Sequence, residues 1–175
     1  MKKMISIIDR ISFYGAIVAG ILVCIICGMI LVEIVLRSFL NTTMYIADEY
    51  AGYAMALISF LGLGYTLSQN GHIRMTFIHK ALKEKGRGII DLFAYLVGVL
   101  VSFYIVVVTW KYFFASAVDG SRSMQISQTP LAIPQFFVFL GSVMLALQFI
   151  SETCKAYLIV KGDTEVEIKE GAEFI

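Results

Sequence analysis

Long uncharged runs alternate with short charged segments along the whole chain. Between Arg10 and Glu33 there are 22 residues without a charge. As a helix rising about 1.5 Å per residue, this run would be about 33 Å long. A bilayer has a hydrocarbon core about 30 Å thick, so the run is long enough to span it. Three further uncharged runs lie between Glu49 and His72, between Asp91 and Lys111, and between Arg122 and Glu152.

The pattern predicts an all-α integral membrane protein with four transmembrane helices. The expected spans are residues 11–32, 50–67, 92–110 and 130–150. Together they form one transmembrane domain, residues 1–161, followed by an acidic tail, residues 162–175, that we expect to be disordered. The Asp119-Gly120-Ser121 stretch predicts a turn, and Thr129-Pro130 is expected to start the fourth helix.

Composition agrees with a membrane location. Apolar residues make up 59% of the chain, charged residues 15%, and the mean hydropathy is +0.83. Soluble domains have about 45–50% apolar and about 25% charged residues, so a water-soluble globule is excluded. A net charge of +1 argues against an extended basic surface, and no nucleic-acid partner is expected.

Basic residues predict the orientation. Of the 14 Lys and Arg residues, 11 lie in the N-terminal segment, the second loop and the C-terminal segment, and 3 lie in the first and third loops. The positive-inside rule therefore predicts that both termini are cytoplasmic and that the first and third loops face outward.

The second loop has the pattern of a helix lying on the membrane. Met75, Ile78 and Leu82 recur at helical spacing, and Gly86 is expected to end the helix. A basic amphipathic interfacial helix is therefore predicted between spans 2 and 3. The basic residues expected to bind lipid headgroups are Arg74, Lys80, Lys83 and Lys85.

Reactive chemistry is sparse. The four predicted span cores contain no Asp, Glu, Lys, Arg or His, whereas proton relays and ion sites are usually marked by such residues at mid-depth. Cys24-x-x-Cys27 has redox-pair spacing but lies in mid-span, where helix packing is the better interpretation. His72 and His79 lie in one segment without other ligands. We expect no enzyme activity, no cofactor and no metal.

Polar residues gather at the predicted outer ends of the first two spans. Glu33 and Arg37 follow span 1, and Asp48 and Glu49 precede span 2. They could simply reach the outer headgroups, with Glu33 and Arg37 paired at i, i+4. Alternatively, Glu33 or Glu49 could need a partner on another helix or subunit. The second interpretation makes all four residues candidates for contact with a subunit or a binding protein.

Two stripes of small residues are candidates for helix packing, because small side chains let helices approach closely. The first stripe consists of Ala16, Gly20 and Cys24, and the second of Gly52, Ala56, Ser59, Gly62 and Thr66. Packing within the chain and docking of another subunit both remain open.

Three sequence elements occur in an order found in a known family. Asp48-Glu49-Tyr50 opens the second span, Ser59-Phe60-Leu61-Gly62-Leu63-Gly64-Tyr65 lies within it, and Gly71-His72-Ile73-Arg74-Met75 follows it. On these elements the chain resembles the small membrane subunit of a TRAP (tripartite ATP-independent periplasmic) transporter, of DctQ type and SiaQ-like. Chain length, span count and orientation also fit.

This resemblance implies a three-part secondary transporter in a bacterial or archaeal inner membrane. The partners would be a large membrane subunit (DctM-type) that carries the transport site and a periplasmic substrate-binding protein (DctP-type), with membrane lipids around the complex. The family takes up organic acids such as C4-dicarboxylates and sialic acids, usually with sodium, and its small subunit supports an elevator-type large subunit. No substrate or sodium ligand is carried over to this chain.

Two other functions compete with this one. A self-sufficient small multidrug-type exporter would need a central membrane glutamate, for which only Glu33, at the end of its span, is a candidate. A membrane redox protein would need the cysteine pair or the histidines described above.

Overall fold

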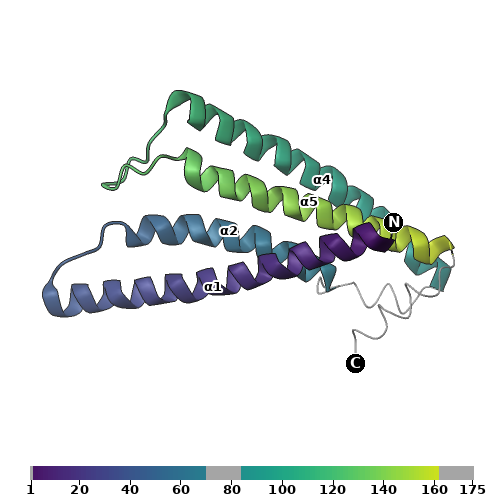
Figure 1. The fold of residues 1–175 in the computed structure, drawn as a ribbon, viewed down its shortest axis with the longest axis horizontal. Coiled ribbons are helices and arrows are strands. Elements are labelled where there is room, and N and C mark those ends of the chain that lie inside the picture. Colours follow the sequence, from purple (N-terminus) through teal and green to yellow (C-terminus); the bar gives the residue numbers. More distant parts are fainter. Residues whose placement is uncertain (1, 70–83, 162–175) are drawn as a thin grey trace.

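The computed structural model describes residues 2–69 and 84–161, which form four long helices (Figure 1). They are α1 (Lys2–Leu40), α2 (Ala47–Ser68), α4 (Glu84–Asp119) and α5 (Ala132–Lys161). All four are long and apolar enough to cross a membrane. The described residues contain no strand, only one isolated bridge between Arg122 and Pro130. The prediction of an all-helical protein with four membrane helices is confirmed.

Most of the helices are longer than the uncharged runs. α1 has 39 residues, about 58 Å at the usual rise, compared with the 22 residues of the uncharged run. The length of an uncharged run indicates the part of a helix that lies in the hydrocarbon core of the membrane. The helix can continue beyond that core, because most charged side chains are good helix formers. The sequence therefore predicted the spans better than the helix ends.

Two predicted helix boundaries are wrong. α5 begins at Ala132, and Thr129 and Pro130 belong to the preceding loop, where Pro130 pairs with Arg122. Pro134 instead occupies the first turn of α5, where its missing N–H costs no helical hydrogen bond. Gly86 does not end a helix but lies in the first turn of α4.

Part of the predicted interfacial helix lies outside the described residues. Arg74, Lys80 and Lys83 belong to this part. The predicted tail, residues 162–175, also lies outside the described residues. Lys85, expected at the end of the interfacial helix, lies in α4.

The helices form two hairpins that lie side by side (Figure 1). α1 packs along α2, α4 packs along α5, and α5 joins the hairpins by packing against α2 and, over a shorter stretch, α1. The connections 41–46 and 120–131 lie at one end of the bundle, here named the loop end. The start of α1 and the end of α5 lie at the opposite end, here named the terminal end. How this bundle is oriented across the membrane stays a prediction.

One face of α1 is turned toward the other helices. Its buried residues recur every three or four positions from Ile5 to Ala19 and every seven positions from Ala19 to Glu33, which is the spacing of a coiled-coil seam. They are Ile5, Ile8, Ser12, Gly15, Ala19, Ile26 and Glu33. Most large apolar side chains on the other faces of the bundle are exposed. An apolar exterior of this kind requires lipid or another membrane protein around it.

Besides the approach of Gly15 in α1 to the flexible end of Met144, glycine permits two close approaches between α5 and its neighbours that involve aromatic side chains. A Cβ atom on Gly98 of α4 would lie 3.0 Å from Cζ of Phe149 and nearer still to two other carbons of that ring. A Cβ atom on Gly141 of α5 would lie 2.8 Å from Cβ of Phe60 in α2. Since no other residue lacks a Cβ, these two positions set how tightly α5 packs on both sides.

Aromatic rings fill the α4–α5 contact toward the loop end. The ring centroids of Trp110 and Phe139 are 5.1 Å apart, and those of Phe113 and Phe136 are 5.3 Å apart. These tilted pairs have the separation typical of favourable ring contacts.

Candidate functional site: polar clusters at both ends and an open helix face

Glu33 organises the connection between α1 and α2. Its Oε1 accepts a hydrogen bond from Arg37 Nε at 2.6 Å and another from the Thr43 hydroxyl. Its Oε2 accepts one from the Met44 amide at 2.7 Å. Although Glu33 is buried, both of its oxygens therefore have partners within the chain. Arg37 also lies 3.7 Å from Asp48, whose side chain is 90% exposed.

Glu49 fastens the 120–131 loop to α2. Its Oε1 accepts a hydrogen bond from the Tyr53 hydroxyl at 2.6 Å, and its Oε2 accepts one from the Ser127 hydroxyl. Thr129 donates to Ser127 Oγ at 3.0 Å and lies 3.4 Å from the Tyr50 hydroxyl. The buried carboxylate thus joins the two hairpins at the loop end.

The loop itself has a regular backbone. Gly120 adopts φ +61° after the end of α4, and the Ser121 amide donates to the Ser116 carbonyl at 3.2 Å, as in a Schellman cap. This confirms the predicted turn at Asp119-Gly120-Ser121. The Ser123 amide donates to Thr129 O at 2.9 Å and the Leu131 amide to Ser121 O at 3.0 Å.

The structure supplies partners within this chain for both Glu33 and Glu49, the two residues for which a partner on another helix or subunit was one of two open interpretations. Glu33 finds its partners beside its own helix, and Glu49 finds Ser127 far along the chain. Contact of these residues, or of Arg37 and Asp48, with another protein stays a prediction. Of these four candidate contact residues, Arg37 and Asp48 are accessible, with side chains 56% and 90% exposed.

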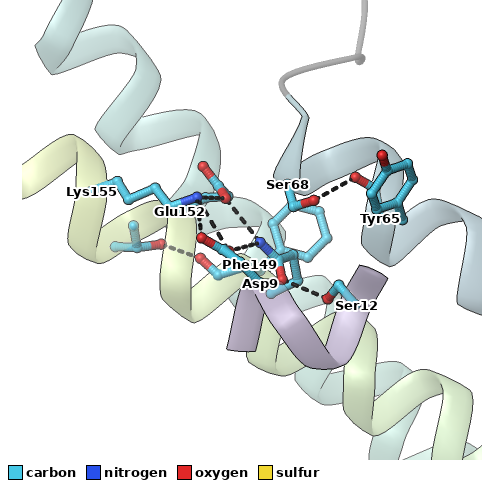
Figure 2. A network of polar contacts seen from close by, with 9 residues as sticks. Asp9, Ser12, Tyr65, Ser68, Phe149, Glu152 and Lys155 are labelled. Atoms are coloured by element: carbon cyan, nitrogen blue, oxygen red, sulfur yellow. Dashed lines mark hydrogen bonds and ion pairs between the residues drawn. The ribbon is translucent and has the colours of Figure 1, made fainter. Parts of the chain in front are cut away.

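A second polar cluster, which the sequence analysis missed, lies between α1 and α5 at the terminal end (Figure 2). Its members are Asp9, Ser12, Gln148, Glu152 and Lys155, and we name it the Asp9–Glu152 cluster. Lys155 Nζ lies 2.8 Å from Glu152 Oε1 and 3.1 Å from Asp9 Oδ2. Gln148 Nε2 donates to Glu152 Oε1 and to Asp9 Oδ1, at 2.9 Å each.

Burial distinguishes this cluster from a surface ion pair. The side chains of Ser12, Gln148 and Glu152 are all fully buried, and Ser12 donates to Gln148 Oε1 at 2.6 Å. Among the described residues, Glu152 Oε2 and Ser151 Oγ are buried without any hydrogen-bond partner. One signal was present in the sequence, because Gln148, Glu152 and Lys155 recur at i, i+4 and i+7 on one helix face.

The two small-residue stripes turn away from the rest of the chain. A Cβ atom on Gly20, Gly52 or Gly62 would meet nothing within 4 Å. Cys24 is an exposed free thiol, and Ala16 and Ala56 are half-buried. Ser59 and Thr66 donate to carbonyls of their own helix. The stripes therefore do not carry the packing within the chain, and docking of another subunit on them stays a prediction.

Within residues 2–69 and 84–161, no group of three or more His, Cys, Asp or Glu side chains could hold a metal ion. The charged residues of the two clusters lie near the ends of the helices and are bound by polar groups of this chain. The arrangement can fasten helices and loops together and leaves the glycines of the two small-residue stripes uncovered by the described residues.

Comparison with known proteins agrees with these features. The family described as "Tripartite ATP-independent periplasmic transporters, DctQ component" matches residues 26–158. The ectoine TRAP transporter small permease protein TeaB of Halomonas elongata is 27% identical over 173 residues, covering 90% of this chain and 87% of TeaB. No solved structure matches the chain. Since the family match covers well over half of the sequence, the chain belongs to the DctQ family of small TRAP transporter subunits.

Proposed function

We propose that this chain is the membrane scaffold on which a large elevator subunit works during ion-driven uptake of an organic acid. Sodium is the proposed coupling ion, and a C4-dicarboxylate or a sialic acid the proposed substrate class. Membership of the DctQ family supports a small permease subunit of a multi-pass inner-membrane transporter. The name of the relative TeaB adds ectoine to the substrates worth testing.

The open face of α1 and α2 carries the scaffold proposal. In lipid there is little hydrophobic force between helices, and association depends on close packing of small residues. Gly20, Gly52 and Gly62 offer such positions, and no side chain of the described residues covers them. We therefore assign this face to the large membrane subunit.

The distribution of ionisable groups supports a role without transport chemistry of its own. A transport site needs charged or converging polar ligands near mid-depth. Here Glu33 is engaged by Arg37, Thr43 and Met44 close to the end of α1, which counts against a multidrug-type exporter. Cys24 and Cys27 are free thiols in the middle of the apolar run of α1, and this position in mid-span counts against a redox pair.

The charged residues at the loop end suit contact with a soluble partner. Arg37 and Asp48 are accessible, and Glu49 acts on the same surface by holding the 120–131 loop in place. We assign this surface to the periplasmic substrate-binding protein. The basic residues Arg74, Lys80, Lys83 and Lys85 are assigned to anionic lipid headgroups, at about 1 kcal/mol for each residue near the membrane surface.

Co-purification with the large membrane subunit tests the scaffold role. Gly62→Leu places a bulky side chain on the open face, where its Cβ atom would meet nothing within 4 Å in this chain. The variant should fold but bind the large subunit more weakly, by about 1–3 kcal/mol if the side chain overpacks the interface. Ala115→Leu, at an exposed position of α4, is the matched control and should co-purify normally.

The lone chain provides the complementary measurement. Without its partner the open apolar face meets only lipid or detergent, so we expect low abundance or aggregation, with rescue by co-expression. A monodisperse lone subunit would count against the scaffold role. Uptake of substrate or cations by liposomes containing only this chain would show that the role is wrong.

A further inference from the structure

The Asp9–Glu152 cluster has an imbalance of charge. It contains two carboxyl groups and one ammonium group, so its net charge is −1 when all three are ionised. The side chain of Glu152 is 0% exposed and that of Lys155 is 13% exposed. An uncompensated charge at such a depth is strongly unfavourable, whereas a neutral set of the same groups is tolerated.

The hydrogen bonds show where the imbalance resides. Lys155 and Gln148 both donate to Glu152 Oε1, at 2.8 and 2.9 Å. Glu152 Oε2 is buried and accepts no hydrogen bond from any described residue. A carboxylate spreads its charge over both oxygens, so an unpartnered buried oxygen is a poor place for it. A protonated acid instead carries its hydrogen on one oxygen and keeps the other as a carbonyl acceptor.

Asp9 is the poorer position for a proton. Its Oδ1 accepts from Gln148 at 2.9 Å and its Oδ2 lies 3.1 Å from Lys155 Nζ. Its side chain is also 32% exposed, so water can stabilise its charge. Asp9 and Lys155 together form a balanced ion pair, and Glu152 is the remaining acid.

The surrounding helices bring no further cation to Glu152 among the described residues. α2 ends nearby with Ser68, whose hydroxyl donates to the Tyr65 carbonyl at 2.7 Å (Figure 2). α4 packs along α5 and carries Asp91 toward the same end, a half-buried residue with interactions of its own. Neither group neutralises a second carboxylate in the cluster.

We propose that Glu152 is a proton-binding site, which holds one proton on Oε2 and makes the cluster that fastens α1 to α5 neutral. The proton comes from water and returns to it without any other reactant. Loss of the proton leaves a buried charge between α1 and α5 and loosens their contact. The proposal concerns this chain alone and does not depend on the scaffold role.

Infrared spectroscopy of the full chain in lipid nanodiscs tests the proposal. With carbon-13 in the glutamate side-chain carboxyls, the wild-type protein at neutral pH should show a protonated-carboxyl band that shifts with the label. Glu152→Gln should remove the band. Asp48→Asn, which changes an exposed carboxyl, should remove only ionised-carboxylate intensity and serves as the control.

Two further measurements make the test decisive if Glu152→Gln fails to fold. Asp9→Asn removes one negative charge, so Lys155 alone balances Glu152, and the protonated band should disappear although Glu152 is present. In the wild-type protein, raising the pH into the alkaline range should remove the same band and lower the thermal unfolding midpoint.

Three results would overturn the proposal. The first is a wild-type spectrum without a protonated glutamate at neutral pH. The second is a band that persists in Asp9→Asn, because charge balance would then not be its cause. The third is an ionised Glu152 whose carboxylate signal changes with sodium concentration at constant pH, because Oε2 would then hold a metal cation. The readout follows carboxyl groups of this chain, so it is separate from success or failure of complex assembly.

Discussion

Replacing Gly98 with alanine should force α4 and α5 apart. The added methyl carbon would lie 3.0 Å from Phe149 Cζ and closer to two other ring carbons. Carbon atoms pack best at about 3.5–4.0 Å, so the ring or the helix must move by more than about 1 Å to relieve the nearest contacts. Overpacking of this kind typically costs about 1–3 kcal/mol.

A second glycine separates the steric effect from the general effect of removing glycine. Alanine in a helix interior is favoured over glycine by about 0.5–1 kcal/mol. Gly52→Ala should therefore stabilise the chain by about that amount, because its methyl group would meet nothing within 4 Å. The Gly98→Ala variant should be less stable than the Gly52→Ala variant by about 1–3 kcal/mol, the overpacking cost alone.

Unfolding of this chain alone, in detergent micelles that each hold one copy, can be followed by circular dichroism and measures both free energies without the large subunit that we assign to the Gly52 face. Phe149→Leu should relieve part of the cost in the Gly98→Ala background, giving a coupling energy of about 0.5–3 kcal/mol in a double-mutant cycle. Equal stability of the two glycine variants, together with zero coupling to Phe149, would refute the packing argument.

Two further predictions concern the loop end and the basic residues of the predicted interfacial helix. Glu49→Gln should speed hydrogen exchange at the Ser123 and Leu131 amides and weaken coupling to the binding protein, while the sodium dependence of residual uptake stays unaltered. Asp48→Asn is the neighbouring control for exchange, and a changed sodium stoichiometry with intact assembly would contradict the assignment. Replacing Lys80, Lys83 and Lys85 with glutamate should reduce uptake at equal membrane abundance, without changing the substrate affinity of the binding protein. Normal uptake by this variant would contradict the lipid-anchoring role.

The four membrane helices could be predicted because the signal is local. A long run without charge has few alternatives to a membrane helix, and each helix satisfies its own backbone. The ends could not be placed, since Pro130 precedes a helix without belonging to it and Gly86 lies inside one. At Pro130 the hydrogen bonds within the 120–131 loop, and not the preference of proline for a first helical turn, accompany the later start of α5.

Contacts between distant segments could not be predicted from one sequence. A partner for Glu33 or Glu49 was one of two open interpretations, but nothing near Glu49 in the sequence points to Ser127, 78 positions away. Asp9 and Lys155 are 146 positions apart and each looks like an ordinary interfacial charge. These pairs depend on which helices become neighbours in the fold.

The glycines show the same limit. Small residues at Gly20, Gly52 and Gly62 were recognised as permitting close approach, yet the close approaches within the chain use Gly98 and Gly141. A small residue indicates that another helix can approach closely at that position, but it does not indicate which helix. The rotation of each helix about its own axis supplies that information.

The aromatic contact between α4 and α5 gives the protein a built-in optical probe. Trp110 is the only tryptophan in the chain, and its ring stacks among Phe113, Phe114 and Phe139. Phe139 is the ring that α5 contributes, and indole emission depends on the polarity around the ring, so the tryptophan fluorescence of the purified chain responds to this contact and to the surroundings of the exposed part of Trp110. Since α4 packs chiefly on α5, a red shift of that emission signals that the α4–α5 hairpin has opened, and no label has to be attached to a membrane helix to see it.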